Sequence, residues 1–244
     1  MKLKKAGLKM MRLNKYIAES GITSRRKAED LILQGRISLN GEIITELTYK
    51  VDPGKDEIYL DGEKINLKKH QYYLLNKPAG VVTTTNDEKK RRTVLDIIKT
   101  NERIYPVGRL DYSTTGVLFL TNDGNFSQLL THPGNKVPRE YEVLLDKPLS
   151  RDDLEKLLRG IYPGGVKGKF QNISFIDTKH YSRVKVTTVE GRNHFVKNMF
   201  GALGYHVLKL NRISYAGIKA NIGRGEYRKL TAQEIKQLTA KYGK

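Results

Sequence analysis

Residues 108–116 combine a carboxylate, a cation and flanking glycines in one short loop. The loop reads Gly-Arg-Leu-Asp-Tyr-Ser-Thr-Thr-Gly and runs into the apolar segment 117–120, which is typical of a buried strand. Asp111 thus lies close to Arg109 in a loop supported by rigid structure, and a reactive carboxylate needs such a setting. The alternative is a structural carboxylate that stabilises the Ser113–Thr115 turn, and charge and spacing alone favour that role.

The chain is strongly basic. Its 244 residues carry a formal net charge of +19, with a pI near 9.9. This charge favours a polyanionic partner, most simply nucleic acid, over a generally basic surface. Residues 1–70 carry a net charge of +5 and the remainder carries +14, so both parts can contact phosphates.

Cysteine is absent, which excludes disulfides, thiolate catalysis and cysteine-ligated metals and fits a cytoplasmic location. No apolar run is long enough to span a membrane. Residues 1–10 form a basic extension with no apolar signal-peptide stretch after it, and Met10–Met11 is an alternative start. The five histidines are scattered without metal-binding spacing; His194 and His206 are expected to be structural or RNA-facing.

Residues 11–65 are predicted to form a compact ααβ unit. Helical spacing begins at Leu13 and stops near Gly21, and a second helix capped by Thr23 or Ser24 ends near Gly35. Asn-Gly and Asp-Gly pairs between apolar runs then predict two hairpins. The unit resembles the S4-type RNA-binding domain through these segments: Arg12–Lys15, Gly21, Ser24–Glu29, Gly35–Ile37 and Asn40–Gly41.

A basic cluster surrounds the start of the second helix, where free backbone N–H groups also attract anions. The candidate RNA-contact residues are Arg12, Lys15, Arg25, Arg26 and Lys27. The alternative for Arg25 and Arg26 is a solvated helix face. A polar linker is predicted at 66–71.

Residues 72–244 are predicted to form an α+β domain with a mixed or antiparallel sheet, because strands and helices are interspersed without strict alternation. Expected strands are 72–76, 81–85, 116–121, 139–145, 170–177, 182–190, 205–213 and 226–230. Expected helices are 93–99, 125–131, 151–159, 193–203 and 232–242. The charged loop 87–92 is either a solvated connection or an RNA contact.

Five segments of this domain resemble the pseudouridine synthases, enzymes that isomerise uridine within RNA. In order, they are Leu75–Gly80, 105–124, Arg139–Val143, Glu190–Lys197, and Leu210–Arg212 continuing to Gly225–Leu230. Their order and the preceding S4-like domain resemble the branch that modifies ribosomal RNA. Any one match is weak alone, but all of them in sequence are specific.

The resemblance implies roles for individual residues. Asp111 is implied to be the catalytic carboxylate, attacking the ribose or the base or abstracting a ribose proton, and Lys197 its cationic partner. Tyr141 is implied to stack on the flipped uracil, and its hydroxyl to assist proton removal at carbon 5. Leu210 is implied to pack against the other face of the base, although ordinary core packing explains it equally well. Arg109 is expected to shape the loop or to enter the site as the nucleotide flips out.

The implied reaction breaks the C–N glycosidic bond of uridine, rotates the base and forms a C–C bond to its carbon 5. No redox change or energy input is required, so no cofactor is expected. The chain departs from the family at Phe195, where glutamine is usual, and at Asn198, where a second basic residue is common. Phe195 is expected to turn into the core at helical spacing with Met199 and Leu203.

Ribosomal RNA, or its precursor particle, is therefore the expected partner of a monomeric enzyme. Residues 131–141 are most similar to the B type of the family, which modifies large-subunit RNA, and residues 13–17 are similar to the F type. A third alternative is the A type, which modifies small-subunit RNA. Two other classes remain: a catalytically idle ribosomal-RNA-binding assembly factor, and a general polyanion binder without preference for RNA. The intact set of Asp111, Tyr141 and Lys197 favours the enzyme.

Overall fold

The computed structural model describes residues 10–177 and 179–243, so residues 1–9 of the predicted basic extension lie outside the described part. The chain divides into two compact units. One contains the residues up to His70 together with Asn101–Arg103, and the other contains Gln71–Thr100 and Ile104–Lys244. No helix within the described ranges is long and apolar enough to cross a membrane.

The first unit packs two helices on short strands. Ser24 caps the second helix, because its side chain accepts a hydrogen bond from the Lys27 N–H. Leu13, Ile17 and Ile32 are completely buried between the helices and the strands. The elements are β1 (Met11–Arg12), α1 (Leu13–Glu19), α2 (Arg25–Leu33), β2 (Ile37–Leu39), β3 (Glu42–Ile43), β4 (Lys50–Val51), β5 (Ile58–Leu60) and β6 (Glu63–Lys64).

The two predicted hairpins of this unit are confirmed. Asn40 and Gly41 have φ of +51° and +93°, and Asp61 and Gly62 have +50° and +84°. Positive φ at both central residues is the signature of the tight turns that match strand twist. The hairpins join in a sheet of order β3-β2-β5-β6. In the segment 66–71, Leu67 packs on this core and the Lys68 N–H donates to the Glu19 carbonyl.

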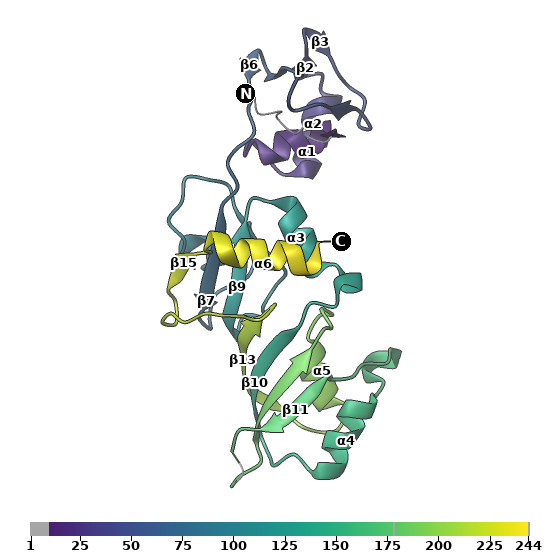
Figure 1. The fold of residues 1–244 in the computed structure, drawn as a ribbon, viewed down its shortest axis with the longest axis vertical. Helices are drawn as coiled ribbons and strands as arrows, with labels where there is room; N and C mark the ends of the chain where they lie inside the picture. The colour runs from purple at the N-terminus through teal and green to yellow at the C-terminus, as the bar shows by residue number, and fades with distance from the viewer. Residues whose placement is uncertain (1–9, 178, 244) are drawn as a thin grey trace, which may run out of the picture. The chain divides into compact units, whose positions relative to one another are not determined.

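The second unit has a mixed sheet, which confirms the α+β prediction (Figure 1). Within the described residues its order is β11-β12-β10-β13-β9-β7-β15, with β14 on β13 and β8 on β9. Among the strand pairs of the described residues, only β13 and β9 run parallel. The strands are β7 (Tyr72–Lys77), β8 (Tyr105–Pro106), β9 (Thr115–Thr121), β10 (Arg139–Leu145), β11 (Asn172–Phe175), β12 (Arg183–Thr188), β13 (Val207–Tyr215), β14 (Ile218–Lys219) and β15 (Tyr227–Lys229).

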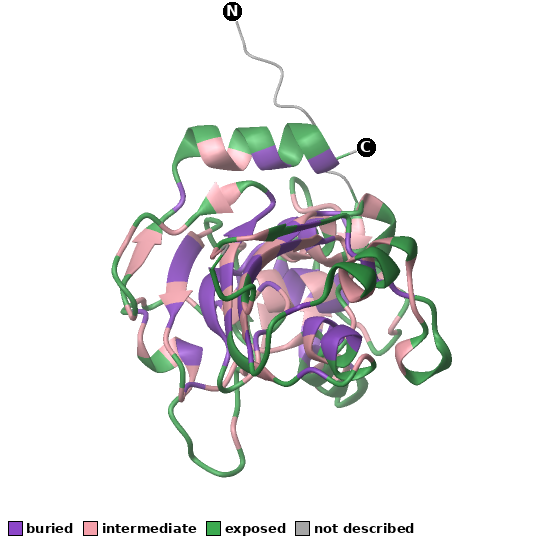
Figure 2. Ribbon diagram, turned by 90° about the horizontal axis from the view of Figure 1, so that it is seen from below, coloured by how far each residue is buried: buried purple, intermediate pink, exposed green. Residues whose placement is uncertain are grey.

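Helices pack on different parts of this sheet. The helical elements are η1 (Val94–Asp96), α3 (Gly124–Thr131), η2 (Pro133–Asn135), α4 (Arg151–Arg159), η3 (Pro163–Gly165), α5 (Phe195–Gly201) and α6 (Ala232–Tyr242). Helices α3 and α6 pack against β7 and β9 through one cluster, while α4 and α5 cover β10, β12 and β11 through another (Figure 1). Strand β9 is buried along its whole length, with Val117 and Phe119 in one cluster and Leu118 and Leu120 in the other. Figure 2 shows the buried residues concentrated in the sheet.

Two predicted elements are wrong. Residues 81–85 are not a strand; only Val82 forms an isolated bridge, to Thr93, and the Thr83 hydroxyl donates to the Leu110 carbonyl instead. The helix expected at 93–99 is a single 3₁₀ turn. Thr93 and Asp96 cap each other across this turn, and the Lys99 N–H donates to the Tyr227 hydroxyl rather than extending it. The segment 81–85 is therefore tied to the Asp111 loop through Thr83, whereas 93–99 is tied to strand β15 through Tyr227.

Candidate active site

The loop that carries Asp111 is fixed between β8 and β9. Gly108 begins it with φ of +73°, a conformation that favours glycine. The Thr114 N–H donates to the main-chain carbonyl of Asp111 at 3.1 Å. No backbone N–H in the described residues donates to the Asp111 carboxylate, so the side chain does not cap the turn through the main chain. The carboxylate is 25% exposed, which leaves it accessible from the cavity described below.

A buried lysine holds this loop through hydrogen bonds to its main chain. Lys77, at the end of β7, is completely buried, and its Nζ donates to the carbonyls of Pro78, Asp111 and Thr114 at 3.0, 3.1 and 2.9 Å. The Tyr112 carbonyl lies at 3.4 Å. Burial lowers the pKa of Lys77 to about 8, and the negative charge of Asp111 opposes this shift. Lys77 is thus a positioning residue. The sequence analysis did not predict this role, although a lysine at the end of an apolar strand could have indicated it.

Lys77→Met is expected to destabilise the second unit by at least about 3 kcal/mol, because several buried carbonyls lose their donor. The loss of stability caused by Lys77→Met should increase with pH. The folded pKa, about 8, lies below the unfolded value of 10.5. The unfolded chain therefore binds more protons between these pH values, and the wild type gains stability there.

Between pH 7 and pH 10 the difference in unfolding free energy between wild type and Lys77→Met should widen by about 2 kcal/mol. Urea unfolding monitored by circular dichroism measures this difference. Lys236→Met, on the exposed face of α6, is the control and should show a constant difference. A Lys77→Met difference that shrinks or stays constant with pH would contradict this assignment.

Two side chains from the start of α5 face the Asp111 carboxylate. Lys197 Nζ lies 2.8 Å from Oδ2, and His194 Nε2 lies 3.3 Å from Oδ1. The Thr114 hydroxyl is 3.5 Å from Oδ2. His194 has φ of +52°, an uncommon conformation for a non-glycine residue that is often found at functional sites. The pair of Lys197 and Asp111 was predicted, but the contact of His194 was not, because it depends on this local backbone turn.

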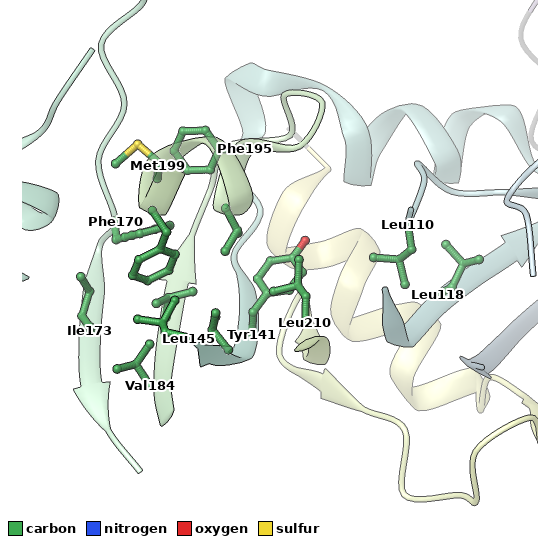
Figure 3. Close-up of a cluster of buried hydrophobic side chains, with 14 of the residues drawn as sticks. Leu110, Leu118, Tyr141, Leu145, Phe170, Ile173, Val184, Phe195, Met199 and Leu210 are labelled. Carbon is green, nitrogen blue, oxygen red and sulfur yellow. The ribbon is translucent and has the colours of Figure 1, made fainter. Parts of the chain in front are cut away.

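A cavity opens beside Asp111. Its volume of about 130 Å³ is close to the ~150 Å³ at which a protein cavity holds one benzene ring. The predicted residues Arg109, Asp111, Tyr141 and Leu210 all line it. Tyr141 on β10 and Leu210 on β13 lie next to each other, as Figure 3 shows, and each is only 8% exposed. The cavity therefore suits one flat ring beside an apolar wall.

A second hollow adjoins the first along the Asp111 loop. It is lined by Arg109, Asp111 and His194, and by the charged loop through Asp87 and Arg91. Arg109 is exposed, and its Nη2 lies 3.5 Å from the Asn193 Oδ1. Arg91 forms a bidentate pair with Asp87. The charged loop 87–92 is therefore a wall of the hollow beside the site and not a remote connection.

Phe195 lies in the core, as predicted: it is 5% exposed and packs edge-on against Phe170 at 5.8 Å between ring centres. Asn198 is exposed on α5, and its Nδ2 lies 3.5 Å from the Asn193 carbonyl. The departure at Phe195 therefore leaves the charged groups around Asp111 in place.

The predicted RNA-contact residues of the first unit lie on α1, α2 and the preceding strand. Arg12, Arg25, Arg26 and Lys27 are exposed, and Lys15 is partly buried beside Glu19 at 3.6 Å. Because Arg25, Arg26 and Lys27 form the first turn of α2, their charges add to the partial positive charge of its N-terminus. Within the described ranges, no group of His, Asp and Glu side chains is arranged to hold a metal ion.

Comparison with known proteins identifies both units. Residues 71–202 match the RNA pseudouridylate synthase family, and residues 11–58 match the S4 domain. The chain is 42% identical to ribosomal large subunit pseudouridine synthase B of Bacillus subtilis (strain 168), over 95% of this chain and 96% of the relative. It is 35% identical to the dual-specificity RNA pseudouridine synthase RluF of Escherichia coli (strain K12), over 92% of this chain and 77% of the relative.

The fold agrees with these matches. The crystal structure of a pseudouridylate synthase superposes with a TM-score of 0.68 and 32% sequence identity, covering 93% of this chain and 99% of that one. The two resemblances predicted from the sequence, of the first unit to the S4 domain and of the second to the pseudouridine synthases, are thus confirmed. The chain belongs to the RNA pseudouridine synthases that carry an N-terminal S4 domain, and it is an isomerase of this family.

Proposed function

We propose that this enzyme converts a specific uridine of large-subunit ribosomal RNA to pseudouridine, with Asp111 as the catalytic carboxylate and without a cofactor. The observation that carries the proposal is the Asp111–Lys197 pair at 2.8 Å beside a cavity of one-ring size. The choice of large-subunit RNA is supported by 42% identity to a large-subunit synthase over nearly the full length of both chains.

The reaction is an isomerisation, so its atoms balance without a second substrate. The C1′–N1 bond breaks, the base turns, a C1′–C5 bond forms, and the proton on C5 is lost while N1 gains one. Asp111 can begin this sequence by attack on the ribose or the base, or by removing a ribose proton, and each route requires an ionised carboxylate. Lys197 Nζ balances that charge at 2.8 Å from Oδ2, and His194 Nε2 lies 3.3 Å from Oδ1.

The residues that line the cavity are suited to bind the uracil base. Tyr141 supplies a ring on which uracil can stack, and its hydroxyl is suited to assist the loss of the C5 proton. Leu210 adds an apolar surface next to it. A base can enter this cavity only after leaving its own stack, which costs a few kcal/mol, so an unpaired loop or bulge is the expected target. Arg109, exposed at the cavity edge, is placed to contact the flipped nucleotide.

The first unit anchors structured RNA. Replacing Arg25, Arg26 and Lys27 together by glutamine should weaken RNA binding and flatten its salt dependence. Each lost phosphate contact removes about 0.7–0.9 from the slope of log K against log salt, so a change of about 2–3 is expected. Filter binding to a large-subunit transcript at several salt concentrations measures it. The double variant Lys236→Gln/Lys241→Gln, on exposed positions of α6, is the control. An unchanged slope would remove α2 from the RNA interface.

Incubation of the purified protein with large- and small-subunit ribosomal transcripts, followed by carbodiimide mapping, tests the substrate. One new pseudouridine in the large-subunit transcript is expected, and none in the other. A single site in the small-subunit transcript would correct the substrate while keeping the enzyme. No product in either transcript or in precursor particles would favour an idle binding factor.

A further inference from the structure

Arg212 is a buried cation whose hydrogen-bonding capacity is not filled by the protein. It is 2% exposed on β13 and lines the cavity beside Asp111 and Tyr141. Its Nε donates to the Val117 carbonyl at 2.7 Å, but its buried Nη2 has no acceptor among the described residues. An unsatisfied polar group of this kind is costly to bury, so its position in a binding cavity suggests a ligand acceptor.

Arg139 provides an internal comparison. It lines the same cavity and is 7% exposed. Its guanidinium carbon lies 5.0 Å from the centre of the Tyr215 ring, which Arg212 also contacts. Its Nη1 donates to the carbonyls of Val137 and Val189, and its Nη2 lies 3.4 Å from both the Leu130 carbonyl and the Tyr215 hydroxyl. Arg139 therefore has protein acceptors for both terminal nitrogens and acts as a structural residue.

The guanidinium of Arg212 is held in one place. It lies 4.5 Å from the centre of the Tyr215 ring, which itself stacks on Phe119. Its backbone runs against β9 at Gly116, where an added Cβ would collide with the Arg212 main chain. Only glycine permits this approach, which presses Arg212 against the loop strand. The donor therefore has a defined position, and because Nη2 has almost no accessible surface, a ligand in the cavity reaches it only when the side chains around it move.

We propose that Arg212 donates a hydrogen bond from Nη2 to a carbonyl oxygen of the target uracil, O2 or O4, and stabilises the negative charge that the base carries during the isomerisation. When the C1′–N1 bond breaks heterolytically, the bonding pair moves to N1 and spreads over the ring and both carbonyl oxygens. Arg212 transfers no proton in this step. This inference rests on the proposed function, since it requires a uracil in the cavity.

The same contact selects the base if O4 is the acceptor. Cytosine presents an amino group where uracil presents O4, so an arginine at that edge would face a donor and reject it. At O2 the contact would stabilise charge without distinguishing the two bases. The two possibilities are separated by replacing one oxygen at a time.

The test combines a protein change with a substrate change. Large-subunit RNA fragments are made with uridine, 2-thiouridine or 4-thiouridine at the modified position, and single-turnover rates are measured by nucleoside chromatography. Sulfur is the weaker acceptor, so one of the two thio substitutions should slow the wild type about 10-fold through the weakened contact. In Arg212→Met that same substitution should change the rate less than about twofold, because the contact is already lost.

Arg139→Lys is the matched control and should keep the full thio effect, whatever it does to stability. Arg212→Lys, which keeps the charge and loses the planar fork, is the second variant, and circular dichroism verifies the fold of each. If the wild type is active and neither thio effect depends on Arg212, the inference is overturned and the proposed function stands. If the wild type makes no pseudouridine in any RNA, the proposed function fails, and the inference fails with it.

Discussion

Asp111→Asn should abolish pseudouridine formation while RNA affinity stays within about twofold of the wild-type value. The substitution keeps the shape of the side chain and removes its charge, so it should spare the loop that Lys77 holds through main-chain carbonyls. The loss should reach at least about 10⁴-fold, the upper end of what one positioned acid–base group contributes. Single-turnover assays on the mapped RNA and filter binding measure the two quantities.

Asp152→Asn is the matched control for this experiment, because Asp152 is an exposed aspartate on α4, outside the cavity. It should retain full activity. Turnover by Asp111→Asn at a rate near that of the control would refute the catalytic assignment. Loss of RNA binding together with activity would instead show that the carboxylate holds the loop in a binding-competent shape.

Lys197→Met should lower the single-turnover rate by about 10²–10³-fold, the cost typical of removing one preorganised electrostatic partner. The 2.8 Å contact with Oδ2 would be lost, leaving His194 at 3.3 Å from the other oxygen. Lys197→Arg should recover activity to within about 10-fold, since it keeps the charge in a different geometry. RNA affinity should change little in either variant, and the same two assays measure this.

Lys219→Met, an exposed lysine on β14, controls for the loss of one positive charge. Full activity of Lys197→Met would mean that catalysis by Asp111 does not require the positive charge of Lys197. Equal defects in the methionine and arginine variants would point to a steric role for Lys197 and not an electrostatic one.

Local signals made much of the fold predictable. The Asn40–Gly41 and Asp61–Gly62 turns, the Ser24 cap and the buried strand β9 each depend on a few adjacent residues, and the structure confirms them. The prediction of a strand at 81–85 was wrong because Val81 and Val82 make contacts that do not require a strand. Val81 enters the core from a loop, while Val82 bridges to Thr93.

The candidate site was predictable where the family motif names the residue, as for Asp111 and Lys197. It was not predictable where a role depends on the distance between segments far apart in the chain. Lys77 reaches the Asp111 loop across 34 positions, and the His194 contact depends on a left-handed turn at the start of α5. Arg212 had one usable signal: it lies two residues after Leu210 on a strand, and alternation places both on one face.

Carbodiimide mapping of ribosomal RNA tests the central claim most directly, using cells that carry the gene, lack it, or carry its Asp111→Asn allele. The proposed function predicts one pseudouridine in large-subunit RNA that is present with the wild-type gene and absent from the other two. A site that persists in the Asp111→Asn cells would contradict the role of Asp111. Identical maps from all three strains would contradict the assignment of ribosomal RNA as the substrate.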